Sequence, residues 1–128
     1  MIKLDHIALY VRDLNAAKEF FIEFLDARPS ELYHNQKTGF KSSFLRFDND
    51  TRLEIMSRPG LDHSDNSLIR TGYIHIAFRV GSRDKVDRLT ARLQDAGYKI
   101  ISGPRITGDG YYESQILGIE GNILEITE

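Results

Sequence analysis

Leu53-Glu54-Ile55 and Leu124-Glu125-Ile126 are two matching stretches that decide how this chain folds. In each, a glutamate stands between two apolar residues, as in a β-strand whose side chains alternate between a packed face and an open face. Each stretch closes a series of segments that begins with a histidine between apolar residues, His6 in the first series and His75 in the second. The sequence therefore predicts one structural unit written twice, with two polar side chains from each copy.

The first copy has the order β-α-β-β-β. A strand at residues 4–11 is followed by Asp13, a residue type favoured at helix N-caps, and then by a helical pattern of apolar residues. Because Pro29 cannot continue a helix, we expect this helix to end near residues 27–28. The remaining strands of the first copy are predicted at residues 31–34, 40–47 and 52–56.

The second copy repeats this order. A strand at residues 73–80 precedes Ser82 as the N-cap, and Gly97 stops the second helix. The last three strands are predicted at residues 99–102, 111–117 and 122–127. The fold class is therefore α+β, built from two βαβββ modules.

The two modules are expected to form one domain over residues 1–128. Module 1 covers approximately residues 1–57, module 2 approximately residues 73–128, and the polar, turn-rich residues 58–72 form the linker. One such module alone could not bury enough apolar surface to be stable, so the modules must pair, within the chain or between chains.

Composition excludes several classes of partner and site. Lys and Arg number 17 and Asp and Glu 19, for a net charge of -2, and neither sign forms a block that would bind nucleic acid or an anionic membrane. The sequence has neither an apolar run long enough to span a bilayer nor a secretion signal, so a cytoplasmic protein is expected. With no cysteine, any metal must be held by His and carboxylate.

Strand alternation places four ionisable residues on the open faces of their sheets: His6, Glu54, His75 and Glu125. Each alone has an ordinary interpretation, a hydrogen-bonded histidine or a solvated glutamate. Their occurrence at matching places in two matching copies favours a divalent metal site. His34, beside a turn, and His63, in the linker, are predicted to be exposed.

Two further residues are candidate substrate contacts. Arg46 shares a face with Phe44 and is predicted to bind an anionic group, or else to form a salt bridge at the rim. Tyr112 follows a glycine-containing segment, residues 107–110, where a lid would be expected, and packing in the core is the alternative for its side chain.

These residues resemble those of the vicinal oxygen chelate superfamily, and within it the glyoxalase I-like proteins. The resemblance covers residues 4–14 (LDHIALYVRDL), 73–78 (YIHIAF) and 120–126 (EGNILEI). It implies that the paired modules form an open eight-stranded cup around one divalent ion, commonly in a homodimer. The resemblance implies that His6, Glu54, His75 and Glu125 are the metal ligands.

Glu54 distinguishes subgroups within this resemblance. Fosfomycin-resistance enzymes and extradiol dioxygenases typically use His, His and Glu, so the acidic residue at position 54 favours a glyoxalase I-type lyase. Tyr10 and Arg58 stand where bacterial glyoxalase I commonly has the Arg and Asn that serve glutathione, so the resemblance does not extend to those positions.

The implied activity is that of a metal-dependent lyase or isomerase acting on a small substrate with vicinal oxygens. Ni, Co, Zn, Mn or Fe would chelate the two oxygens as a Lewis acid, and Glu125 or Glu54 would shuttle a proton between neighbouring carbons. A ligand-sequestering protein of the bleomycin-resistance type, without chemistry, and an Fe(II) dioxygenase are the alternatives.

Overall fold

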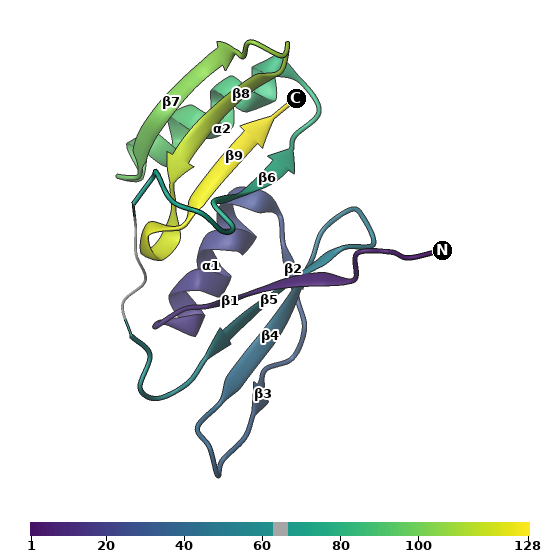
Figure 1. Cartoon of the computed structure of the whole chain (residues 1–128), viewed down its shortest axis with the longest axis vertical. Helices are drawn as coiled ribbons and strands as arrows, with labels where there is room; N and C mark the ends of the chain where they lie inside the picture. The colour runs from purple at the N-terminus through teal and green to yellow at the C-terminus, as the bar shows by residue number, and fades with distance from the viewer. Residues whose placement is uncertain (63–66) are drawn as a thin grey trace. The chain divides into compact units, whose positions relative to one another are not determined.

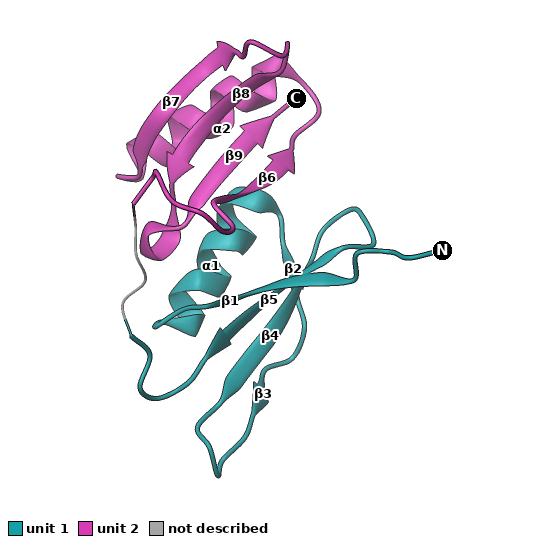
Figure 2. Ribbon diagram, in the orientation of Figure 1, with its two compact units in different colours: residues 1–64 teal, residues 65–128 magenta. Residues whose placement is uncertain are grey.

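The computed structural model describes residues 1–62 and 67–128, so His63 lies outside the described residues. The chain divides into two compact units, residues 1–64 and 65–128, shown in teal and magenta in Figure 2. The boundary between the units falls within the predicted linker. Among the described residues, no helix combines the length and the apolar character that crossing a membrane requires.

Unit 1 has one helix and one open mixed sheet. Strand β1 pairs in parallel with β5, which pairs antiparallel with β4, and β4 carries both β2 and β3 along its other edge. The helix covers one face of this sheet (Figure 1). The elements are β1 (His6–Tyr10), α1 (Leu14–Leu25), β2 (Arg28–Pro29), β3 (Tyr33–His34), β4 (Lys41–Arg46) and β5 (Arg52–Ser57).

Helix α1 begins as predicted and ends earlier than predicted. The side chain of Asp13 accepts a hydrogen bond from the Ala16 backbone, which satisfies a free N–H of the first turn. Asp26 takes a left-handed conformation with φ 54°, and the N–H of Ala27 bonds back to Phe21, so the helix closes at Leu25. The chain therefore turns before Pro29 is reached.

The segment after the helix also differs from the prediction. Pro29 belongs to the short edge strand β2, where a residue without an N–H is tolerated, and the strand predicted at residues 31–34 is reduced to β3. The backbone N–H of Ser30 continues the pairing to Phe44, and the Ser30 side chain accepts from the same residue. The predicted single strand is thus two fragments of one irregular edge.

Unit 2 has the same topology with a more regular edge. Strand β6 pairs in parallel with β9, β9 pairs antiparallel with β8, and β8 with β7. The helix again covers one face (Figure 1). The elements are β6 (His75–Arg79), α2 (Arg83–Asp95), β7 (Lys99–Ile106), β8 (Tyr112–Leu117) and β9 (Ile123–Thr127), with a 3-10 turn at Ile119–Gly121.

The ends of α2 match the sequence prediction. The side chain of Ser82 accepts from the Lys85 backbone, and Gly97 follows the helix with φ 97°, a conformation that glycine adopts without strain. Strand β7 is longer than the predicted residues 99–102 because it continues past two register shifts to Ile106. The described residues therefore contain nine strands rather than the expected eight, in a mixed α+β fold with two open sheets.

The core of each unit lies between its helix and its sheet. The alternation read from the sequence is observed: Leu53 and Ile55 in β5, and Leu124 and Ile126 in β9, are all buried. The aromatic residues of α1 and the aliphatic residues of α2 cover these side chains. Burial of the Leu and Ile on either side fixes each intervening glutamate on the sheet face that the helix does not cover.

Candidate metal centre

One register relationship occurs in both units. In unit 1, Ala8 of β1 pairs with Glu54 of β5, and His6 stands two residues before Ala8. In unit 2, Ala77 of β6 pairs with Glu125 of β9, and His75 again stands two residues before the alanine. Because side chains two apart in a strand share a face, each histidine lies diagonally opposite the glutamate of its own unit.

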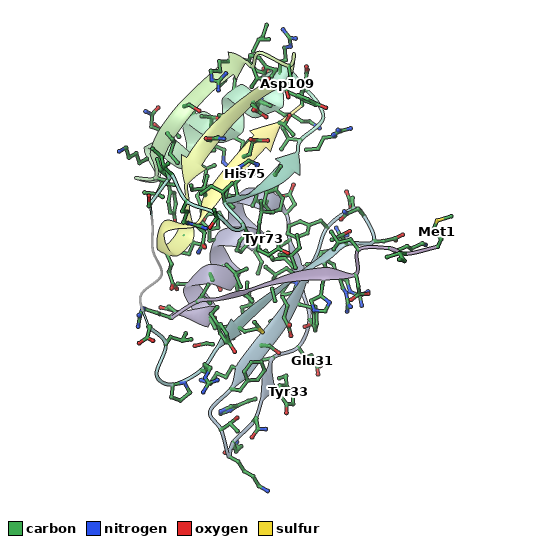
Figure 3. All side chains as sticks on the ribbon, in the orientation of Figure 1. Met1, Glu31, Tyr33, Tyr73, His75 and Asp109 are labelled. Carbon is green, nitrogen blue, oxygen red and sulfur yellow. The ribbon has the colours of Figure 1, made fainter. Side chains whose placement is uncertain are left out.

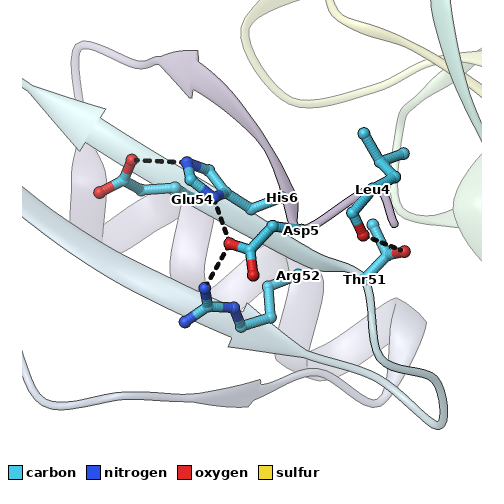
Figure 4. A network of polar contacts seen from close by, with 6 residues as sticks. All are labelled: Leu4, Asp5, His6, Thr51, Arg52 and Glu54. Carbon is cyan, nitrogen blue, oxygen red and sulfur yellow. Dashed lines mark hydrogen bonds and ion pairs between the residues drawn. The ribbon is translucent and has the colours of Figure 1, made fainter. Parts of the chain in front are cut away.

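The His6–Glu54 pair is the candidate metal-binding pair of unit 1, and we call it the first half-site. His6 Nε2 lies 3.8 Å from Glu54 Oε1, and the two side chains are 39% and 16% exposed (Figure 4). The other ring nitrogen, Nδ1, lies 2.7 Å from Asp5 Oδ2. This hydrogen bond, and next the bond from Arg52, lower the pKa of the Asp5 carboxyl, so Asp5 is an anionic acceptor.

The His75–Glu125 pair is the candidate metal-binding pair of unit 2, and we call it the second half-site. His75 Nε2 lies 3.5 Å from Glu125 Oε2, with side-chain exposures of 32% and 14%. His75 projects from β6 (Figure 3). Gln115 of β8, which pairs with Glu125 in the sheet, donates from Nε2 to Glu125 Oε2 at 3.3 Å. The carboxylate is therefore held by a neutral amide from the neighbouring strand.

A second carboxyl group accompanies Glu125. Glu113 lies two residues before Gln115 in β8 and shares its open face, and its side chain hydrogen-bonds with Glu125. Desolvation, followed by this bond and by repulsion from the Glu125 charge, raises the pKa of Glu113 to about 7. The additional carboxyl group of the second half-site thus contacts the glutamate, whereas Asp5 in the first half-site contacts the histidine.

The donor atoms of both half-sites fit a divalent metal ion. Two ligands bound about 2.1 Å from one ion lie about 3.0–3.4 Å apart for angles between octahedral and tetrahedral. The observed separations of 3.8 Å and 3.5 Å need only a small side-chain movement to reach that range. Within the described residues, no group of three or more His, Cys, Asp or Glu side chains is assembled that could hold a metal, so each half-site supplies two donors.

The predicted substrate contacts lie in different surroundings. Arg46 is exposed at the end of β4, on the face that carries Phe44 and Glu54. Tyr112 lies on the other face of its sheet, where its hydroxyl donates to Asp87 of α2 and Arg83 stacks on its ring at 5.0 Å. The Asp87 bond raises the pKa of Tyr112. The structure therefore does not bring Tyr112 together with His75 and Glu125, because α2 holds its side chain.

Sequence reasoning did not identify Asp5, Arg52, Gln115 or Glu113 as neighbours of the ligand candidates. Asp5 could have been found from its position next to His6. Gln115 and Glu113 lie on the same face of β8, as strand alternation predicts. The register that places Gln115 opposite Glu125 of β9, however, depends on the fold. His34 lies in β3 and is exposed, as predicted.

Comparison with known proteins adds one family and three relatives. A family model described as Glyoxalase/Bleomycin resistance protein/Dioxygenase superfamily matches residues 3–126. The uncharacterized protein YqjT of Bacillus subtilis is 29% identical over 112 residues, which are 85% of each chain. A glyoxalase family protein from Bacillus cereus is similar in structure, with a TM-score of 0.85, 18% identity, and coverage of 100% of this chain and 94% of that one.

The third relative is a solved structure with a bound metal. It is a mutant of the genomically encoded fosfomycin resistance protein FosX from Listeria monocytogenes, complexed with Mn(II) and 1S,2S-dihydroxypropylphosphonic acid. Its TM-score is 0.74 and its identity 25%, over 99% of this chain and 93% of that chain.

Proposed function

The chain belongs to the glyoxalase/bleomycin resistance protein/dioxygenase superfamily, and from that premise we propose that it is a divalent-metal-dependent lyase or isomerase of the glyoxalase I type. Its substrate is a small molecule with two vicinal oxygens. His6, Glu54, His75 and Glu125 are the proposed ligands of one ion, which is Ni, Co, Zn, Mn or Fe by the chemistry of the donors. The proposed assembly is a homodimer in the cytoplasm.

The repeated diagonal pairing of histidine and glutamate is the observation that carries this proposal. Each unit turns an imidazole nitrogen and a carboxylate oxygen toward each other on its open face, at 3.8 Å in one unit and 3.5 Å in the other. One such pair alone is common on a sheet surface. Its recurrence at the same register in both units supports a shared role, and the Mn(II) held by the related FosX supports a divalent ion in that role.

An ion held by these four residues would supply Lewis acidity, which would polarise the substrate oxygens and acidify the neighbouring C–H bond. The chain supplies the groups that move the proton. Glu125 or Glu54 takes the proton from one carbon and returns it to the adjacent carbon, so the substrate is rearranged with no net gain or loss of atoms. Gln115 orients Glu125 through its 3.3 Å bond.

Arg46 is the proposed contact for an anionic group of the substrate. It shares the open face with Glu54, and among the described residues no ion pair to it is observed. A guanidinium in this position can bind a carboxylate or phosphonate through two parallel hydrogen bonds. Tyr112 is omitted from this role because it is held by α2.

Metal stoichiometry tests whether the half-sites act together. The protein purified without chelators is expected to bind one divalent ion per four-ligand site, and His6→Ala and His75→Ala are each expected to abolish binding. If each half-site bound its own ion, either substitution would leave the other ion in place. His34→Ala is the matched control, since His34 is exposed in β3 and belongs to neither half-site.

Activity tests the chemistry. Isomerisation of a hemithioacetal should require the ion and should be lost in Glu125→Gln and reduced or lost in Glu54→Gln. Bound metal with no turnover would redirect the search to another vicinal-oxygen substrate. Consumption of O2 with Fe(II) alone would identify a dioxygenase. If the protein bound no metal and neither substitution had an effect, the proposal that it is an enzyme would be wrong.

A further inference from the structure

The first half-site has an outer layer of contacts that the second half-site does not reproduce. Arg52 Nη2 donates to Asp5 Oδ2 at 2.6 Å, and the same Asp5 oxygen lies 2.7 Å from His6 Nδ1, within hydrogen-bond distance (Figure 4). Arg52 also stacks over the Phe44 ring at 4.3 Å, and His6 meets that ring edge-on at 5.4 Å. These contacts join side chains of β4, β5 and β1 with that of Asp5, the residue before β1.

From these contacts we infer that Asp5, held by Arg52, is a positioning residue that fixes the ring orientation and tautomer of His6. An ionised carboxylate can only accept a hydrogen bond, so its partner Nδ1 must carry the proton. Nε2 is then left with its lone pair free, and it is the nitrogen that faces Glu54. A histidine arranged in this way is ready to bind a metal without first moving its proton.

Backbone pairing keeps Asp5 and Arg52 in place. The backbone N–H of Arg52 donates to the Asp5 carbonyl at 3.1 Å, and His6 is the register partner of Arg52 in the parallel pair of β1 and β5. Asp5 and Arg52 are therefore backbone neighbours across the pairing of β1 with β5, and their side chains start close together. Phe44 restricts the guanidinium further, because the ring occupies one of its faces.

Unit 2 has apolar residues at the corresponding places. Ile74 precedes His75 as Asp5 precedes His6, and Ile123 is the register partner of His75 as Arg52 is of His6. Neither isoleucine side chain can accept a hydrogen bond from an imidazole. Unit 2 instead holds its glutamate through Gln115, and the position that matches Gln115 in unit 1 is Phe44.

The two half-sites are therefore prepared in different ways: unit 1 fixes its histidine and unit 2 fixes its glutamate. This inference rests on the proposed function insofar as His6 is a metal ligand. The tautomer of His6 in the metal-free protein, however, can be measured whether or not a metal binds.

The test compares Asp5→Asn with Asp48→Asn. Asp48 is the matched control because it lies in the same unit and forms an exposed ion pair with Arg28, at 3.0 Å. Ring nitrogen NMR shifts of the metal-free protein, recorded at a pH of about 9 where imidazoles are neutral, report the tautomer of each histidine. His75 serves as the internal reference.

We expect His6 to carry its proton on Nδ1 in the unchanged protein and in Asp48→Asn, and to become a mixture of tautomers in Asp5→Asn. The affinity for Zn(II) or Mn(II), measured by titration calorimetry, should fall about 10-fold or more in Asp5→Asn. Removal of a residue that hydrogen-bonds a metal ligand typically has an effect of this size. Arg52→Gln should lower the affinity in the same direction by a smaller factor.

Two results would overturn the inference: a His6 tautomer that is unchanged in Asp5→Asn, or a metal affinity that equals that of Asp48→Asn. An unchanged protein that binds no divalent ion would contradict the proposed function instead. In that case the tautomer comparison still decides whether Asp5 positions His6.

Discussion

His75 Nε2 lies 3.5 Å from Glu125 Oε2, although a helix, two strands and their connections separate the two residues along the chain. The parallel pairing of β6 with β9 makes the contact, because it sets Ala77 beside Glu125 and His75 one diagonal step away. His6 and Glu54 reach the same relationship through β1 and β5. Both half-sites therefore depend on strand pairing between distant segments.

Gln115 is expected to tune the second half-site. Gln115→Leu removes the donor to Glu125 Oε2 and leaves the carboxylate free to rotate. We expect metal affinity to fall by about 10-fold, because outer contacts of metal ligands typically contribute that much. Calorimetric titration with Zn(II) measures it, and Gln94→Leu on the exposed surface of α2 is the control. Equal affinities in the two variants would exclude this role for Gln115.

The metal-free protein should lose stability as Glu113 ionises. Burial and the Glu125 carboxylate raise the folded-state pKa of Glu113 to about 7, above its ordinary value of 4.5. The unfolded chain therefore releases this proton at lower pH than the folded protein does. The contribution of protonated Glu113 to the free energy of unfolding is fully present below pH 4.5 and is lost as the pH rises through about 7.

Glu113→Gln should remove this loss. Thermal unfolding of metal-free protein between acidic and neutral pH should show a shallower decline for Glu113→Gln than for the unchanged chain. Glu31→Gln, an exposed glutamate in the other unit, is the control and should follow the unchanged chain. A Glu113→Gln curve parallel to that of the control would contradict the assignment.

Thr90 and Ser114 form a buried polar pair between α2 and β8. Their hydroxyl oxygens lie 2.7 Å apart, and Thr90 Oγ1 also lies 2.7 Å from the Val86 carbonyl, to which it donates. Thr90→Val should cost about 1–3 kcal/mol because it leaves the fully buried Ser114 hydroxyl without this partner.

The double substitution separates the pair from simple packing. Thr90→Val with Ser114→Ala should cost less than the sum of the two single changes, since no orphaned hydroxyl remains. Urea unfolding of the four proteins gives the coupling free energy. Strict additivity would show that the hydroxyl pair is not the source of the cost.

The N-cap of α1 should matter for stability and not for the half-site. Asp13→Ala removes the acceptor for the Ala16 N–H and should lower the free energy of unfolding by about 1 kcal/mol. Asp13→Ser keeps a capping oxygen and should recover most of that loss. Urea unfolding measures both, and a loss in Asp13→Ser as large as in Asp13→Ala would argue against capping as the cause.

The prediction of α1 shows where local sequence signals are insufficient. Its start follows from Asp13, whose side chain and neighbours define a cap within one turn. Its end depends on Asp26, which adopts the left-handed conformation, and on the hydrogen bond from the Ala27 N–H to the Phe21 carbonyl. The chain then continues into β2 at the edge of the sheet. A proline three residues later predicted a limit to the helix, but not the residue at which it ends.

The sequence by itself determined the repeated βαβββ order, the buried Leu and Ile on either side of each glutamate, and the shared open faces, because strand alternation is a local property of the chain. Only the tertiary structure decided which side chains meet across strands. Register brings Gln115 and Glu113 to Glu125 and sets Arg52 and Asp5 beside His6, and the packing of α2 on its sheet holds Tyr112. Register depends on the pairing of segments far apart in the chain, and no local pattern encodes it.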